Sequence, residues 1–333
     1  MSLEPTLLTL PEVVKDHLFQ YLRYIDIARL HKTCKNLRDY ITVSRPDARF
    51  HVIDISQYND SVYLDLITKN KEDSVELEYK KAEQGCSILT NVGFRCVNSR
   101  NINGLDFIAA FCRDFEMVLR HQKSVLKEVE VCQYSEKIYI CETIRKMLED
   151  PMKKNNQITT KDCKLTDLTP SDACSVLSLF DAKCLKSLRI LGVPILMAPI
   201  DGILQLDHWK HLESVTLWYF GIRNILPDIV HLRRFEAMTT MTSEEVIQLK
   251  NLVLQSTQLT YCQVYCTNWS TDNDLYAFFG SNYVLKLDIV KLYAYKSRKS
   301  KDVWYVEVED QYLTFEKLSV ENVPKNVSII EYD

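Results

Sequence analysis

The sequence predicts an α+β / α/β repeat fold, in which a small helical module precedes an irregular stack of strand–helix units. An apolar stripe at helical spacing near the N-terminus predicts the module, and a short strand pattern that recurs between residues 126 and 264 predicts the stack. The chain has 333 residues, 46% hydrophobic and 26% charged, which is ordinary for a globular protein of about two domains.

Residues 10–41 form the predicted helical module. Within each helix its apolar positions recur at spacings of three and four, and they are Val14, Leu18, Tyr21, Leu22, Leu30, Cys34, Leu37 and Ile41. Pro11 suits the first position of one helix, where its missing N–H costs nothing, and Asp26 is expected to cap a second helix. So short a segment seldom builds a self-sufficient core. We therefore expect it either to dock on the rest of the chain or to bury its apolar surface on a partner.

The residue pattern of this module resembles the F-box. F-boxes open with Leu-Pro, continue with an apolar residue before Phe, and close with Cys and an aromatic residue or Leu. The matching positions are Leu10, Pro11, Val14, Leu18, Phe19, Tyr21, Leu22, Asp26, Arg29, Leu30, Cys34, Leu37 and Arg38. The chain departs from the family at Ile27-Ala28, where Leu-Leu is more usual, and at Leu37, where many members carry tryptophan.

The resemblance implies an F-box of three short helices over residues 7–45 that binds a Skp-type adaptor and, through it, a cullin. The contact with the adaptor is expected on the apolar positions Leu10, Pro11, Val14, Leu18, Leu22, Leu30, Cys34 and Leu37. Some of these side chains must instead hold the core of the module itself.

Residues 46–104 are expected to form short β strands and a linker that pack on the following domain. Alternating apolar and polar residues at 50–55, 61–66 and 75–79 predict three strands with polar turns between them. Residues 91–104 show little periodicity and are interpreted as a loop.

Residues 105–270 are the predicted repeat-like domain. A helix is expected over 105–122, and the pattern Leu-x-x-apolar-x-apolar then begins at Leu126, Leu185, Leu212, Leu232 and Leu259. Most of the intervals lie in the range of 20–29 residues that leucine-rich repeats use, and 157–165 supplies a degenerate strand within the longest interval. The alternative is a generic α/β domain whose strands happen to begin with leucine.

Two helices between these strands carry start signals. Thr169 precedes Pro170 at a first helical position, and Thr242 with Glu245 fits a capping box. The segments 111–131, 176–190, 208–210 and 241–250 resemble the FTH domain of nematode F-box A proteins. On this resemblance the chain is identified as a member of that family, with a leucine-rich-repeat-like FTH domain behind the F-box.

Residues 271–333 are expected to form a β segment that caps the stack. Residues 303–308 and 312–315 read as the two strands of a hairpin. The basic run 296–301 is either a nuclear-localisation patch or, as is more common for such runs, a solvated hairpin loop.

Composition excludes several classes of function. The net charge of -4 and the pI near 6.0 give no reason to expect a nucleic acid or a membrane as partner. The longest apolar stretch, 190–200, is too short to span a bilayer, and no secretory signal is visible, so a cytoplasmic or nuclear location is expected. Trp209, Trp218, Tyr219 and Phe220 could anchor a target, but aromatic residues at strand spacing are more often core.

The sequence favours a protein without catalytic activity. Its seven glycines lie at least eight residues apart, which excludes the glycine-rich loops that cradle phosphates and the nucleophile elbow of hydrolases. The 11 cysteines include no C-x-x-C pair, and Cys262 with Cys266 lacks a convincing second pair of zinc ligands, so no cofactor is expected.

These observations predict the substrate-recognition subunit of a Skp–cullin–F-box ubiquitin ligase. Its F-box would bind the adaptor and its repeat-like domain would bind a target protein. Three alternatives stay open: a scaffold whose F-box-like helices pack internally, an adaptor-binding protein whose targets are not degraded, and an enzyme of an unrecognised type.

Overall fold

The computed structural model describes residues 6–93, 95–134, 157–193, 198–221, 226–266, 279, 284–286, 290–298, 300–309 and 311–332. The chain divides into two compact units, the first comprising Met1–Asp162 with Ser178–Asp181 and the second Cys163–Leu177 with Ala182–Asp333. No helix among the described residues is long and apolar enough to cross a membrane.

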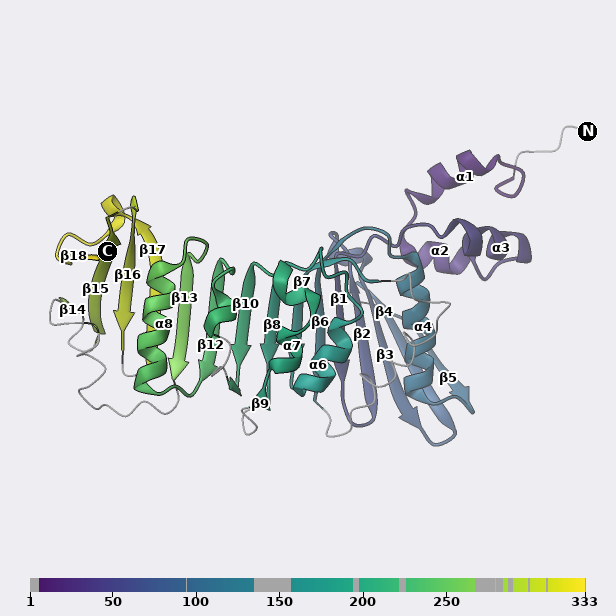
Figure 1. The fold of residues 1–333 in the computed structure, drawn as a ribbon. Helices are drawn as coiled ribbons and strands as arrows, with labels where there is room; N and C mark the ends of the chain where they lie inside the picture. The colour runs from purple at the N-terminus through teal and green to yellow at the C-terminus, as the bar shows by residue number, and fades with distance from the viewer. Residues whose placement is uncertain are drawn as a thin grey trace, which may run out of the picture. The chain divides into compact units, whose positions relative to one another are not determined.

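The first unit begins with three short helices, drawn in purple in Figure 1: α1 (Glu12–Phe19), α2 (Tyr24–Leu30) and α3 (Lys35–Ser44). Pro11 occupies the N-cap position of α1, and its carbonyl oxygen accepts from the backbone N–H groups of Val14 and Lys15 at 3.0 Å. Arg45, in the left-handed conformation with φ 46°, ends α3.

The prediction that Asp26 caps the second helix is wrong. Arg23 is the N-cap residue of α2, and Asp26 lies inside its first turn. There the carboxylate accepts from Arg23 Nε at 2.8 Å and from Arg29 Nη1 at 3.3 Å. A carboxylate in the first turn still favours the helix, because the unpaired N–H groups make that end positive.

Strands β1 to β6 of the first unit form a sheet in the order β6-β1-β2-β3-β4-β5. Their bounds are β1 (Val52–Gln57), β2 (Ser61–Ile67), β3 (Val75–Ala82), β4 (Gly85–Val92), β5 (Arg95–Asn103) and β6 (Leu126–Gln133), and η1 (Lys71–Asp73) precedes β3. Strands β1 to β5 run antiparallel to their neighbours, and β1 pairs with β6 in parallel. The strict alternation of buried and half-buried residues in β1 and β2 means that one face of the sheet is covered.

Helix α4 (Phe107–His121) covers that face. Asp106 caps it by accepting from the backbone N–H of Ile108 at 2.9 Å. The rings of Tyr79 on β3 and Phe111 on α4 meet edge to face with centroids 5.8 Å apart, and the hydroxyl of Tyr79 donates to Asp114 at 3.1 Å. The predicted helix at 105–122 is therefore confirmed.

The interpretation of 91–104 as a loop is wrong, because β5 lies there. Nearly all residues of β5 are exposed, whichever face of the sheet they lie on. The strand therefore has no alternation of apolar and polar residues that would predict it from the sequence. Its pairing with β4 defines it instead. Gly85 makes that pairing possible, since a Cβ atom there would lie 2.1 Å from the carbonyl oxygen of Ile102.

The second unit contains a ladder of parallel strands. Strands β8 (Ser187–Leu191), β10 (Ser214–Trp218), β12 (Arg234–Thr239) and β13 (Tyr261–Cys266) follow one another in parallel, and β7 (Thr160–Thr166) lies beside β8. Their first residues are in register, Ser187 with Ser214, Ser214 with Arg234, and Arg234 with Tyr261. The repeated leucines two positions earlier, which are Leu185, Leu212, Leu232 and Leu259, are all buried.

The connections between these strands differ in length and type, so the ladder is only partly repeat-like. They contain α6 (Pro170–Leu177), α7 (Asp201–Leu204), η3 (Asp207–His211), η4 (Leu226–Ile229) and α8 (Ser243–Gln255), and Figure 1 shows α7 and α8 in front of the strands. A separate pair, β9 (Ala198–Pro199) and β11 (Phe220–Gly221), joins two of these connections. The capping box predicted at Thr242 and Glu245 is present, and Thr169 accepts from the N–H of Asp172 at the start of α6.

Antiparallel strands complete the second unit: β14 (Val284–Lys286), β15 (Val290–Ser297), β16 (Asp302–Val308) and β17 (Tyr312–Ser319). The predicted hairpin is β16–β17, and β17 pairs with β13, so it continues the sheet from the last parallel strand. The basic run begins with the last two residues of β15, and its other described residues lie in the turn from β15 to β16.

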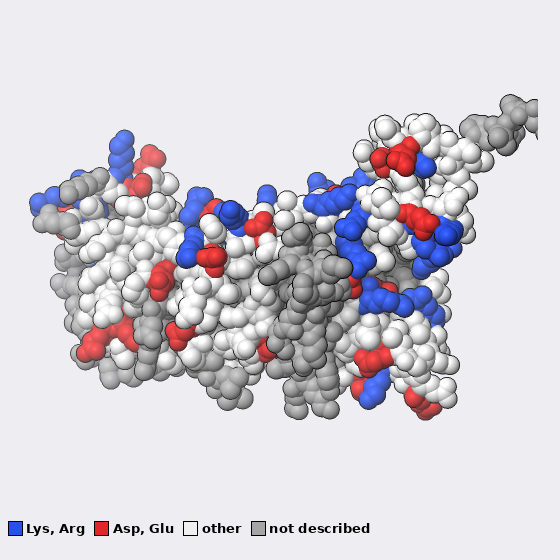
Figure 2. All heavy atoms as spheres, turned by 45° about the vertical axis from the view of Figure 1, so that its right-hand side comes forward, with Lys and Arg blue, Asp and Glu red and all other residues white. Residues whose placement is uncertain are grey.

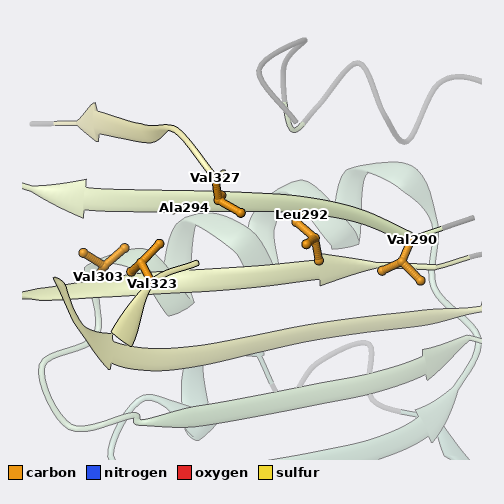
Figure 3. Close-up of a cluster of buried hydrophobic side chains, with 6 residues drawn as sticks. All are labelled: Val290, Leu292, Ala294, Val303, Val323 and Val327. Atoms are coloured by element: carbon orange, nitrogen blue, oxygen red, sulfur yellow. The ribbon is translucent and has the colours of Figure 1, made fainter. Parts of the chain in front are cut away.

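The final segment, with η5 (Val320–Asn322) and β18 (Ile329–Tyr332), covers β15 and β16. Figure 3 shows the resulting cluster of Val290, Leu292, Ala294, Val303, Val323 and Val327. The opposite face of β15 is buried too, because Tyr293 packs against Phe279 with ring centroids 5.5 Å apart.

Candidate protein-interaction surface

Among the described residues, helix α1 contacts the rest of the module through Phe19 and through Lys15 and Asp16. Phe19 is the buried residue of α1, and it joins Ile27 and Ile41 in a small core. Tyr40 of α3 also contacts α1, because its hydroxyl donates to Asp16 and its ring lies 4.7 Å from the ammonium of Lys15.

Helix α1 and the residues just after it present apolar side chains at the surface. Val13 and Tyr21 are 79% and 74% exposed, and Val14 and Leu18 are each 41% exposed. Val14 and Leu18 lie four residues apart and therefore on one side of the helix. In Figure 2 this module, at the upper right, shows a surface on which charged side chains form only small groups.

The structure divides the eight expected adaptor contacts into two groups. Pro11, Val14 and Leu18 are exposed, while Leu10 and Cys34 are partly buried. The other three belong to the interior of the module: Leu37 is buried, and Leu22 and Leu30 pack against the core of Phe19, Ile27 and Ile41. Helical periodicity could not separate the groups, because both kinds of residue lie on apolar stripes.

The F-box-like module packs closely on the sheet of the first unit at a junction formed by α2, the following linker and the end of α4. The ring of Tyr24 on α2 lies 5.0 Å from that of Phe50 and 6.4 Å from that of His121. Arg49 donates to the carbonyl oxygen of Leu22 at 2.9 Å. Residues of α2, the linker and the end of α4 thus pack together.

Asp47 holds the linker between the module and β1. Its Oδ1 accepts from the backbone N–H groups of Lys123 at 2.9 Å, Ser124 at 3.2 Å and Arg49 at 3.1 Å. Close by, the ring of His121 contacts the carbonyl oxygen of Pro46 through Nδ1 at 3.1 Å, and burial lowers the pKa of its imidazole. No periodic signal in the sequence indicates this junction, because its groups are far apart along the chain.

An ion-pair network adds to the junction. Arg23, the N-cap residue of α2, pairs with Asp26 at 2.8 Å and with Asp73 of η1 at 3.3 Å. The hydrogen bond and charge of Arg23 hold the pKa of Asp26 below its usual range. The side chain of Arg23 is 47% exposed, so the network orients the module more than it stabilises it.

The aromatic residues of the second unit separate in the same way as the contacts on α1. Trp209 and Phe220 are buried, as expected for core residues, and the indole of Trp209 donates to the carbonyl oxygen of Asp228 at 3.1 Å. Trp218 is 39% exposed, against that expectation, and Tyr219 has a positive φ of 68°.

The cysteines considered as metal ligands lie in the core of the second unit. Cys262 and Cys266 are both buried on β13, and burial raises the pKa of the Cys266 thiol to about 12. Among the described residues no three potential ligands lie close enough together to hold a metal ion.

Comparisons with known proteins agree with the predicted order of domains. Residues 7–48 match the family model described as the F-box domain, and residues 140–281 match the one described as the FTH domain. The FTH domain expected from the sequence, 105–270, begins and ends earlier in the chain than the range that matches the family model, 140–281.

The chain is also similar to "F-box A protein 224" of Caenorhabditis elegans, with 21% identity over 252 residues. The aligned region covers 71% of this chain and 60% of the relative, so the chain spans well under the whole length of the curated protein it matches. The matches confirm the expectation of an F-box followed by an FTH domain.

Proposed function

We propose that this chain, in which an F-box precedes an FTH domain, is the substrate-recognition subunit of a Skp–cullin–F-box ubiquitin ligase. F-boxes generally bind a Skp-type adaptor, and the proposal assigns that role to residues 7–48. The target protein would bind elsewhere on the chain, and the complex would work in the cytoplasm or the nucleus.

The exposed apolar side of α1 is the observation that carries the proposal. Val13, Val14, Leu18 and Tyr21 are exposed on a helix of eight residues and its C-terminal flank, while Phe19 alone in that helix is buried. Val14, Leu18 and Tyr21 recur at spacings of four and three, so they share one side, and exposed apolar side chains that gather in this way mark a site for another protein. This exposed surface argues against the alternative of a scaffold whose F-box-like helices pack internally, because the described residues of the chain do not cover this side of α1.

Within the proposed interface, Leu10, Pro11, Val14 and Leu18 contact the adaptor, and Cys34 lies at its margin. Leu22, Leu30 and Leu37 contribute indirectly, because they hold α1 and α2 on the module's core. An interface of standard size buries about 1,600 Å², with a few central residues providing most of the affinity.

The chain would act without performing chemistry itself. The ubiquitin-conjugating enzyme brought by the cullin carries the reactive thioester, and the bound target presents the lysine. Holding both in one complex raises their effective concentration and orients them. The junction around Tyr24, Asp47 and Arg49 supports this role, because it fixes the F-box against the sheet of the first unit.

Binding to a purified recombinant Skp-type adaptor tests the proposal. We expect the wild-type chain to bind, and the double variant Val14→Ala with Leu18→Ala to bind about tenfold or more weakly with an unchanged melting temperature. The matched control is Val320→Ala with Val230→Ala, which removes valines of similar exposure, 42% and 38%, from the second unit.

The possible outcomes test two things separately, the ligase function and the location of the adaptor-binding surface on α1. A wild-type chain that does not bind the adaptor would contradict the ligase function and favour the scaffold. Binding that survives the α1 double variant would move the interface away from α1. If the adaptor binds, affinity purification with proteasome inhibition identifies target proteins, and their turnover distinguishes a degrading ligase from an adaptor-binding protein of another role.

A further inference from the structure

The sheet of the first unit has a second face that α4 does not cover. Along each strand, successive side chains point to opposite faces. Ile53, Val62 and Tyr79 are buried on the side of α4, so the alternate residues of β1, β2 and β3 lie on the opposite side.

Carboxylates line up across this opposite face. Asp54 of β1 is in register with Asp65 of β2, and Asp65 with Glu76 of β3. On the other side Asp54 is in register with Glu130 of β6. Directly opposed residues on neighbouring strands have Cβ atoms only about 5 Å apart. We call this row Asp54, Asp65, Glu76 and Glu130 the acidic row.

Asp65 lies at the centre of the acidic row, between Asp54 and Glu76. Its Oδ1 is buried without a hydrogen-bond partner among the described residues. Burial, with the charges of Glu76 and Asp54, raises the pKa of its carboxyl group to about 6. Like charges in adjacent positions destabilise a sheet, so the arrangement favours the binding of a cation.

Three tyrosines lie at one end of the same face, next to the C-terminal ends of β1 and β6 and the N-terminal end of β2. Tyr58 and Tyr134 stack with ring centroids 5.1 Å apart and planes 26° apart, and Tyr63 meets Tyr58 edge-on at 5.5 Å. Tyr58 and Tyr134 are 42% and 51% exposed. We call these three residues the tyrosine cluster.

The tyrosine cluster is held in place and is open on one side. The hydroxyl of Tyr63 donates to Glu78 at 2.8 Å, and the backbone N–H of Tyr134 donates to the carbonyl oxygen of Gln57 at 2.8 Å. The three rings line a shallow hollow together with Asn59, Asp60 and Ser61. A cation above an aromatic ring is attracted to its negative face, and a planar guanidinium can stack on it.

We propose that this face binds a basic, arginine-rich segment of a partner protein, with one guanidinium on the tyrosine cluster and neighbouring cationic side chains over the acidic row. Charge complementarity selects the occupant, because the described residues of this face carry carboxylates on the four adjacent strands β6, β1, β2 and β3. An acidic segment or a nucleic acid would be repelled.

This proposal names the class of target segment that the ligase subunit would carry, and the identification of that segment as a target rests on the proposed function. Its physical test does not, because peptide binding is measured on the full chain without adaptor. Failure of the peptide to bind and failure of the adaptor to bind are therefore separate results.

Fluorescence anisotropy with a short labelled peptide of alternating arginine and serine provides the test. The comparison peptide carries citrulline in place of each arginine, which keeps the shape and removes the charge. We expect the arginine peptide to bind at least about tenfold more tightly, and to lose affinity as salt is raised.

Paired variants of the full chain locate the site. Tyr58→Ala with Tyr134→Ala should weaken the arginine peptide about fivefold, and Tyr134→Phe should leave it unchanged, because the ring face remains. Glu76→Gln should weaken it about threefold and reduce the dependence on salt. Tyr312→Ala and Glu244→Gln are the controls, since both positions are exposed in the second unit.

Two results would overturn the inference. One is equal affinity of the chain for the arginine and citrulline peptides. The other is a loss of affinity in Tyr312→Ala or Glu244→Gln as large as that in the variants of the proposed face, since the peptide would then respond to general surface charge.

Discussion

The ring of Tyr24, on the second helix of the F-box, meets the ring of Phe50, just before the first strand, edge to face with centroids 5.0 Å apart. Phe50 is buried, and burial raises the pKa of the Tyr24 hydroxyl above its usual range. This contact joins two elements that the sequence pattern assigns to separate parts of the chain.

Removing the Tyr24 ring should loosen the F-box without changing its adaptor surface. We expect Tyr24→Ala to lower the stability of the first unit by about 2–3 kcal/mol, because a packed aromatic side chain is lost. Hydrogen exchange should increase around residues 45–50, while adaptor binding changes little. Tyr24→Phe keeps the ring and serves as the control. Unchanged exchange in the alanine variant would contradict the role of this contact.

Asp65→Asn should stabilise the protein at neutral pH by about 1 kcal/mol, after allowance for the partial exposure of the side chain. The folded-state pKa of about 6 lies above the unfolded value, so the ionised carboxylate costs stability as pH rises through that pKa. The gain should shrink as pH falls toward the unfolded pKa. Urea unfolding at several pH values measures it, and the exposed Asp60→Asn is the control.

A protonatable imidazole in the junction should make the first unit acid-sensitive. Burial lowers the pKa of His121, so its contribution to stability is present above the unfolded-state pKa and is lost as pH falls below it. We expect His121→Asn, whose amide can still donate to Pro46, to lose less stability than the wild type on acidification. Parallel pH profiles for the two proteins would rule out His121 as the sensitive group.

Helix α8 depends on its capping box. The backbone N–H of Thr242 donates to Glu245 at 2.7 Å, and the N–H of Glu245 donates back to the Thr242 hydroxyl at 3.3 Å. Thr242→Ala should lower the free energy of unfolding by about 1 kcal/mol, and Thr242→Asn should restore most of it. Denaturant unfolding measures the change. An equal loss in the neighbouring variant Ser243→Ala would point to a cause other than the cap.

Adding a side chain at Gly85 should disturb the outer hairpin of the first unit. Gly85 has φ 152°, and a Cβ atom there would lie 2.1 Å from the backbone oxygen of Ile102. We expect Gly85→Ala to cost at least about 2 kcal/mol and to detach β5 from β4 before the rest of the unit unfolds. Gly104→Ala tests φ alone, because no atom lies within 4 Å of a Cβ atom placed there.

The sequence by itself determined the elements whose signals are local. The F-box followed from a residue pattern within 10–41, the cap of α8 from four consecutive residues, and the parallel strands from leucines that mark equivalent positions. Such signals survive in the sequence because each residue interacts with close neighbours along the chain, or occupies the same place in successive units.

Tertiary structure alone decided the features that depend on distant residues. Whether Leu18 or Leu37 is accessible depends on how the three helices pack, because both residues lie on apolar stripes with helical spacing. Strand β5 was invisible because both of its faces are exposed and only its pairing with β4 defines it. The acidic row appeared only when register placed Asp54, Asp65 and Glu76 side by side, since register joins residues that the sequence separates by a whole hairpin.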